Sequence, residues 1–153
     1  MKNKLEIVFE ILFDEVSGDM KSALAKMSKG YSMTWMYQGK HELFPFVAAK
    51  QIKKAMNEAY VIKGRVYDIY NYTEQEGSVF LELVESYPVK NKMYRTPLVL
   101  VIYFDKQGKI KLGRHYCDPK IYNNKKLTPQ VLNKVYKKQK IKVRISEKGI
   151  ERY

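Results

Sequence analysis

The sequence predicts one small α+β domain, in which N-terminal helices pack against a cone-shaped, strongly curved antiparallel sheet. The chain has 153 residues and is 45% hydrophobic, which is enough for a single buried core. Helical spacing of apolar residues dominates up to residue 58, apart from one early strand. After that point long alternating segments follow one another through short turns. Helices that mostly precede the strands are typical of α+β folds rather than of alternating α/β folds.

Three helices are predicted near the N-terminus. The first covers residues 3–16, where apolar side chains recur at steps of three and four. Asp19 is a good N-cap for a second helix over 20–28, with Gly30 at its C-terminal end. A third helix is predicted over 43–58. Between the last two, alternation from Tyr31 predicts a strand that ends at Gly39, and this strand contains Trp35 and Tyr37.

The sheet is predicted from four further segments rich in aromatic and β-branched residues. They cover residues 60–72, 78–89, 94–104 and 109–117. Asp105 to Gly108 form a hairpin connection between the last two. Long strands joined by short turns predict an antiparallel meander.

The composition changes after Pro119, so we divide the chain into a cone domain, 1–119, and a basic extension, 120–153. The extension holds 11 Lys and Arg residues against two acidic ones, out of a net charge of +13 for the chain. Thr128-Pro129 predicts the start of a helix that runs to about Gln139. Residues 141–146 alternate like an edge strand, and Gly149 predicts a short hairpin. We expect the extension to pack on the same domain.

Several classes of protein are disfavoured by the sequence. Acidic residues interrupt the N-terminal apolar run, and no segment approaches the roughly 18 apolar residues of a membrane span. Two histidines and the single cysteine, Cys117, are too scattered to predict a metal site. A glycine-rich phosphate loop and a Gly-x-Ser-x-Gly elbow are also absent from the sequence. We therefore expect a soluble, cytoplasmic protein without a cofactor.

The hairpin that turns at Asp105 to Gly108 resembles one found in a known protein family. Phe104-Asp105-Lys106-Gln107-Gly108-Lys109-Ile110, followed by Arg114-His115-Tyr116-Cys117-Asp118, resembles the "aromatic, turn, Gly-Lys-Ile, Arg-x-Tyr-x-Asp" hairpin of SnoaL-like proteins. These belong to the nuclear-transport-factor-2-like superfamily, whose element order the predicted helices and strands also resemble. The resemblance covers about residues 5–119. It implies a cone with an internal pocket, and functions that include polyketide cyclases, ketosteroid isomerases, dehydratases, epoxide hydrolases and domains without catalysis.

The resemblance implies that Asp118 acts as a general base, with Tyr116 stabilising an enolate. Strict alternation places Arg114, Tyr116 and Asp118 on one face of their strand, which we take as the concave face. A carboxylate in an apolar pocket has a raised pKa, which suits proton abstraction. The alternative is that Asp118, just before Pro119, caps a turn.

Other candidates for the pocket are the aromatic residues of the strands. The chain has 13 tyrosines, whose apolar rings and polar tips suit a pocket for a ring with a few oxygens. The predicted pocket residues are Trp35, Tyr37, Tyr87 and Arg114. We expect Arg114 to pair with an acid of a neighbouring strand, and the candidates are Asp68, Glu82 and Glu85. His41 and His115 are expected at a surface or interface, since His115 alternates away from Asp118.

Three functions remain open from the sequence. The favoured one is a SnoaL-like pocket protein that binds a small apolar or polyketide- or steroid-like molecule, with or without cofactor-free isomerase, cyclase or dehydratase chemistry. The second is a non-catalytic domain that forms a homodimer through its sheet. The third is weak binding of nucleic acid or acidic lipid by residues 120–148.

Overall fold

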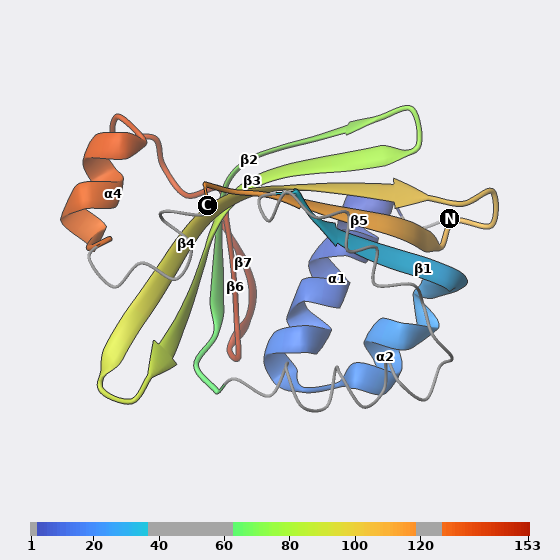
Figure 1. Cartoon of the computed structure of the whole chain (residues 1–153), viewed down its shortest axis with the longest axis horizontal. Coiled ribbons are helices and arrows are strands. Elements are labelled where there is room, and N and C mark those ends of the chain that lie inside the picture. Colours follow the sequence, from blue (N-terminus) through green and yellow to red (C-terminus); the bar gives the residue numbers. More distant parts are fainter. Residues whose placement is uncertain (1–2, 37–62, 119–126) are drawn as a thin grey trace.

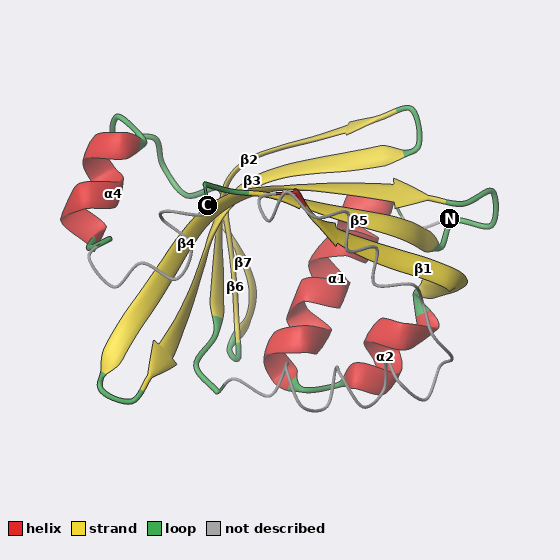
Figure 2. Cartoon of the chain, in the orientation of Figure 1, coloured by secondary structure: helices red, strands yellow, loops and turns green. Residues whose placement is uncertain are grey.

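A computed structural model describes residues 3–36, 63–118 and 127–153. Seven strands form one sheet in the order β1-β5-β4-β3-β2-β6-β7 (Figure 1). The fold class is therefore α+β, as predicted, with helices set against a bent and mostly antiparallel sheet (Figure 2). The bounds are α1 (Lys4–Ser17), α2 (Met20–Ala25), β1 (Met27–Trp35), β2 (Val66–Gln75), β3 (Ser78–Val89), β4 (Lys92–Phe104), β5 (Ile110–Tyr116), α4 (Pro129–Val135), β6 (Val143–Ser146) and β7 (Gly149–Arg152).

The first two predicted helices are confirmed, together with the residues that separate them. The side chain of Asn3 accepts a hydrogen bond from the Leu5 amide and caps α1. Gly18 ends α1 in the left-handed conformation, with φ of 79°. Asp19 then caps α2 by accepting from the Ser22 amide at 3.1 Å. The predicted helix over 43–58 lies outside the described residues.

Strands β2 to β5 form the predicted antiparallel meander. β1 joins this meander at one end and runs parallel to β5. It starts at Met27, so the predictions that a helix continues to residue 28 and that Gly30 ends it are wrong. The amide of Ile110 donates to the carbonyl of Lys26 at 3.1 Å, and this tie to β5 draws the chain into strand conformation immediately after α2.

The basic C-terminal residues continue the same sheet. β6 pairs antiparallel with β2, and β7 folds back on β6 through a turn at Gly149. Thr128 caps α4 through its side chain, with Pro129 in the first turn, as the sequence predicts.

The two faces of the bent sheet carry different helices. α1 and α2 lie on the concave face, and α4 lies on the convex face (Figure 1). The main core is concave: α1 packs Val8, Phe9 and Leu12 against inward-facing strand residues such as Leu81 and Leu100. A smaller convex cluster joins Leu132 of α4 to Tyr70 and Val84.

None of the described helices is long and apolar enough to span a bilayer.

Candidate functional site

The concave face carries a buried acidic residue on α1. Glu15 is 7% exposed and lies among the apolar side chains that α1 turns toward the sheet. The hydroxyl of Tyr67, on β2, donates a hydrogen bond of 2.9 Å to Glu15 Oε2. Tyr67 is itself 5% exposed and belongs to the main core. The carboxyl group is therefore held at a fixed place inside the cone.

A buried ion pair lies on the strands that face Glu15. Nε of Arg65 is 3.2 Å from Oε1 of Glu85, and Arg65 is 6% exposed. Tyr67 and Glu85 are direct partners across β2 and β3, which brings the ion pair next to the Tyr67 ring. The Arg65 guanidinium also lies 5.9 Å from the ring centre of Tyr87. We call Glu15, Arg65, Tyr67 and Glu85 the concave acid cluster.

The electrostatics of this cluster favour a bound proton. Burial raises the pKa of Glu15 from 4.5 to about 7, while the charge of Arg65 and the Tyr67 hydrogen bond oppose that rise. Burial also raises the pKa of Glu85, with Arg65 opposing. Two carboxyl groups thus share one guanidinium. Near neutral pH, Glu15 is poised between its acid and its base form.

Asp14, the neighbour of Glu15 on α1, differs from it in its partners. Its carboxylate pairs directly with the ammonium group of Lys26, which also donates to Ser22. Asp14 therefore has a full opposite charge in contact, whereas Glu15 accepts its hydrogen bond from the neutral hydroxyl of Tyr67. The two neighbouring acids therefore differ in the charge of their partners.

A β-bulge decides which residues of β5 face the cluster. Phe104 pairs with Ile110, but its neighbour Tyr103 pairs with Leu112, so Lys111 is an extra residue on β5. Ile110 and Gly113 both face the main core as a result, and His115 follows on that side because it pairs with the inward-facing Leu100. One inserted residue has exchanged the two faces of the strand.

Comparisons with known proteins address the fold. No family model matches the chain, and no curated protein matches its sequence. Solved structures do match. A nuclear-transport-factor-2-like protein of unknown function from Cytophaga hutchinsonii gives a TM-score of 0.59 at 13% identity, over 78% of this chain and 94% of that one.

Two further structures agree with it. A protein with a ketosteroid isomerase-like fold from Catenulispora acidiphila, in complex with trimethylamine, gives a TM-score of 0.61 at 12% identity, over 81% of this chain and 94% of that one. An LEH-like epoxide hydrolase from M. tuberculosis gives a TM-score of 0.62 at 16% identity, over 86% of this chain and 95% of that one. This chain has the nuclear-transport-factor-2-like fold. The identities are low, so the likeness concerns the fold and not the activity.

Within the nuclear-transport-factor-2-like fold of this chain, the residues predicted on β5 lie apart from the acid cluster. The expectation that Arg114 and Tyr116 face the concave side is wrong, because the bulge at Lys111 reverses the alternation. Arg114 packs on the convex side over the ring of Tyr103, at 5.2 Å from its centre. Tyr116 is 38% exposed, and Asp118 is exposed just beyond the strand.

Two of the three acids expected to pair with Arg114 have other partners. Glu85 pairs with Arg65, and Asp68 accepts two hydrogen bonds from Arg144 of β6, at 2.7 and 3.2 Å. The prediction that these two pair with Arg114 is wrong. The partner of Asp68 was not predicted because Arg144 is far from it in sequence, and the two meet only through the pairing of β6 with β2.

The same bulge turns His115 toward the core side of β5, where it is half-buried, so the predicted surface or interface position is not a freely exposed one. Burial lowers its pKa to about 4, and the imidazole is neutral at physiological pH. Cys117 packs against the main core next to it, and burial raises the pKa of the thiol to about 11. The thiol therefore stays protonated and is a poor nucleophile.

The predicted pocket residues that the structure describes do not lie together. Tyr87 lies beside Arg65, next to the acid cluster. Trp35 is on β1, where it pairs in register with His115. Tyr37 and His41 lie outside the described residues. In the described part of the chain, no three histidine, cysteine or acidic side chains gather closely enough to hold a metal ion.

Glu15 and Arg65 were not selected from the sequence, although one signal could have identified Glu15. It stands three residues after Leu12 and four after Ile11, so helical spacing puts a carboxyl group on the apolar face of α1. Acidic residues are seldom buried unless they are paired, so that position is informative. For Arg65 the pattern carries no comparable signal, because its partner lies on another strand.

Proposed function

We propose that the concave acid cluster binds a small, mainly apolar molecule and exchanges a proton with it through Glu15. The observation that carries this proposal is the buried Glu15 carboxyl group, with a pKa of about 7 and a hydrogen bond from Tyr67. A group that titrates near the working pH is well suited to donate and accept protons. The apolar residues around it suit a hydrophobic ligand, and the few polar groups would orient one oxygen of that ligand.

Roles within the cluster follow from its chemistry. Glu15 is the proton-transfer group, and the Tyr67 hydroxyl orients it and stabilises its ionised form. Arg65 and Glu85 form a neutral pair that holds positive charge close to Glu15 without making the site strongly cationic. The site as a whole is close to neutral when Glu15 is protonated, which favours an uncharged ligand such as a ketone or an epoxide.

The neighbours in fold support the choice of probe substrates. One is an epoxide hydrolase and another has a ketosteroid isomerase-like fold. Both reaction classes, opening of an epoxide and proton transfer next to a ketone, use a carboxyl group without a redox cofactor. The proposal therefore belongs to cofactor-free acid and base chemistry.

The decisive experiment measures turnover of a simple cyclic epoxide and of a β,γ-unsaturated cyclic ketone. Wild type, Glu15→Gln and Asp118→Asn are compared. We expect Glu15→Gln to lose about 100-fold or more of the rate with whichever substrate reacts, as for removal of a general acid or base. Asp118→Asn is the matched control and tests the base predicted from the sequence. Full activity of Glu15→Gln would exclude Glu15 as the proton-transfer group. Loss of activity in Asp118→Asn alone would assign that role to Asp118.

A second function is favoured by a separate observation on the convex face. Val99 and Tyr116 are cross-strand partners, and each is 38% exposed. A homodimer formed through the sheet would bury this pair. We expect Val99→Lys to shift such a dimer to monomer in light scattering. An unchanged mass for the variant would exclude the pair from the interface.

A further inference from the structure

The outer side of α4 is both basic and apolar. Lys134, Lys137 and Lys138, together with Gln130 and Asn133, line an open hollow. Val131 and Val135 lie on α4 with Lys134 and are 39% and 60% exposed. Among the described residues, none of the three lysines forms an ion pair. Their charges are therefore available to a partner.

The backbone after α4 holds two of these lysines in an unfavourable conformation. Lys137 and Lys138 have φ of 48° and 64°, and their amides donate to the carbonyls of Lys134 and Asn133. This left-handed helix end normally carries glycine or asparagine, because a Cβ atom is disfavoured there. Two consecutive lysines at such positions are poorly explained by stability, whereas they do place two ammonium groups beside Lys134.

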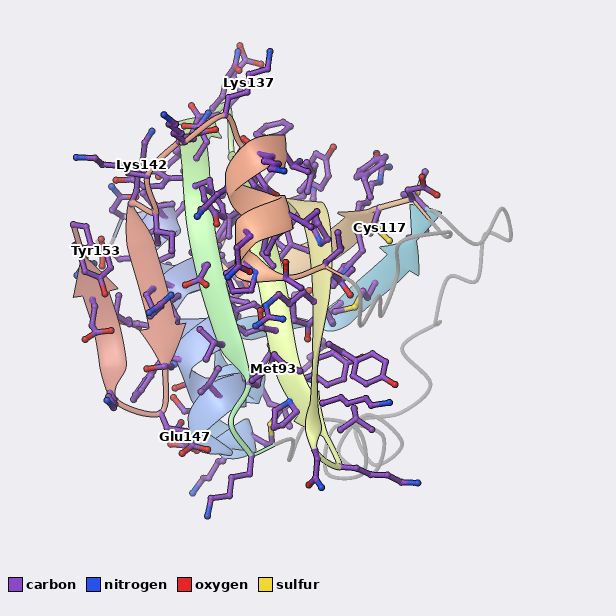
Figure 3. All side chains as sticks on the ribbon, turned by 90° about the vertical axis from the view of Figure 1, so that its left-hand side faces the viewer. Met93, Cys117, Lys137, Lys142, Glu147 and Tyr153 are labelled. Carbon is purple, nitrogen blue, oxygen red and sulfur yellow. The ribbon has the colours of Figure 1, made fainter. Side chains whose placement is uncertain are left out.

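The hairpin between β3 and β4 adds a second element of the same kind. Val89 and Met93 are 41% and 37% exposed at its tip, and Lys90 and Lys92 lie between them. Figure 3 looks onto the side of the molecule that carries α4, with Lys137 near the upper end of the helix and Met93 below it. Aliphatic and ammonium groups thus occur together at two separate places on this side.

We propose that this side of the molecule, the α4 face, docks on an anionic lipid surface. Lysine acts as a point charge toward a negatively charged membrane, and exposed aliphatic side chains enter the boundary between headgroups and acyl chains. Nucleic acid is less suited to the same surface. Stacking of bases needs accessible aromatic rings, yet Tyr136 of this segment is stacked on Tyr70 at 4.0 Å between ring centres. Arg95 is engaged with the carbonyl of Leu127.

The test is co-sedimentation of the full chain with vesicles. Vesicles of phosphatidylcholine alone are compared with vesicles that contain about 30% phosphatidylserine. We expect binding to the second kind at about 50 mM salt, and its loss near 500 mM. Replacing Lys134, Lys137 and Lys138 with Gln should weaken binding about 100-fold, at about fivefold for each lysine. Val135→Ser should weaken it further without altering the charge.

A matched control keeps the net charge equal. Lys21, Lys29 and Lys111 are exposed on α2, β1 and β5, elements that Figure 1 draws apart from α4. Their replacement with Gln should leave vesicle binding within about twofold. Equal loss in both triple variants, or no binding by wild type, would overturn the proposal. Tighter binding to a single-stranded RNA than to acidic vesicles would overturn it too. Lys137→Gly with Lys138→Gly separates stability from docking: we expect a higher unfolding midpoint and weaker vesicle binding.

Discussion

The hydroxyl of Tyr67 donates a 2.9 Å hydrogen bond to the carboxyl group of Glu15, and this contact joins the first helix to the second strand inside the cone. The residues are 52 positions apart in sequence, and both are almost fully buried. A carboxyl group buried in this way lowers the stability of the fold when it is ionised. The pH dependence of the unfolding free energy therefore reports on the site even when its ligand is unknown.

The first prediction concerns Glu15→Gln. Its pKa is raised from 4.5 to about 7 in the folded state, so its contribution to stability is full below pH 4.5 and is lost as the pH rises through 7. A shift of this size corresponds to about 3 kcal/mol. We therefore expect the free energy of unfolding of the variant, relative to that of wild type, to rise by about 3 kcal/mol between pH 4 and pH 8 in urea unfolding. A constant difference across this range would contradict the shift.

The second prediction concerns Glu85→Gln. Removal of this carboxylate removes a like charge that raises the pKa of Glu15, and leaves the guanidinium of Arg65 in need of a counter-charge. We expect the pKa of Glu15 to fall, which can be followed by carbon-detected NMR of the glutamate carboxyls. Loss of one member of a buried ion pair generally costs about 3–5 kcal/mol, and ionisation of Glu15 should reduce that cost here. An unmoved Glu15 resonance would show that the two acids are not coupled.

The third prediction concerns His115→Gln. The folded-state pKa of His115 is lowered to about 4, so its neutral form contributes stability above pH 6.5 and this contribution is lost as the pH falls toward 4. The sign is opposite to that of Glu15. We expect the variant to lose less stability than wild type on acidification from pH 7 to pH 4.5. An equal loss of unfolding free energy in the two proteins between pH 7 and pH 4.5 would show that the imidazole is solvated.

The fourth prediction tests the packing that follows from the bulge. A Cβ atom at Gly113 would lie 3.2 Å from the Tyr31 hydroxyl oxygen and 3.6 Å from Ile102 Cδ1. Gly113→Ala should therefore destabilise the fold by about 1–2 kcal/mol. Gly30, on the adjacent strand, has open space around it, so Gly30→Ala is the matched control and should be neutral or slightly stabilising. Equal effects of the two substitutions would argue against an inward-facing Gly113.

Much of the fold could be predicted because the signals are local. The Asn3-to-Gly18 helix, the Thr128-Pro129 start of α4 and the Ser78–Val89 strand each follow from spacing and caps within a few residues. The bulge at Lys111 could not be predicted, since it depends on how β5 fits between β4 and β1. A shift of one residue leaves the composition of the strand unchanged. It nevertheless turns His115, rather than Arg114, toward the core side of the sheet.

The candidate site depended on that long-range fit more than the fold did. Glu15, Arg65 and Glu85 come from one helix, the start of one strand and the middle of another. The sequence predicts a carboxyl group with a raised pKa inside a cone, and the predicted residue is Asp118. In the structure, Asp118 is exposed, and Glu15 is the interior carboxyl whose pKa burial raises to about 7.

The most direct test of the proposed proton-transfer site is the titration of Glu15 itself, by NMR of the side-chain carboxyl carbon in the full chain. We expect a midpoint close to pH 7 that rises further in Tyr67→Phe, because this variant removes the hydrogen bond to the ionised form. A midpoint near 4.5 in both proteins would show an ordinary solvated glutamate and would contradict the proposed proton-transfer site.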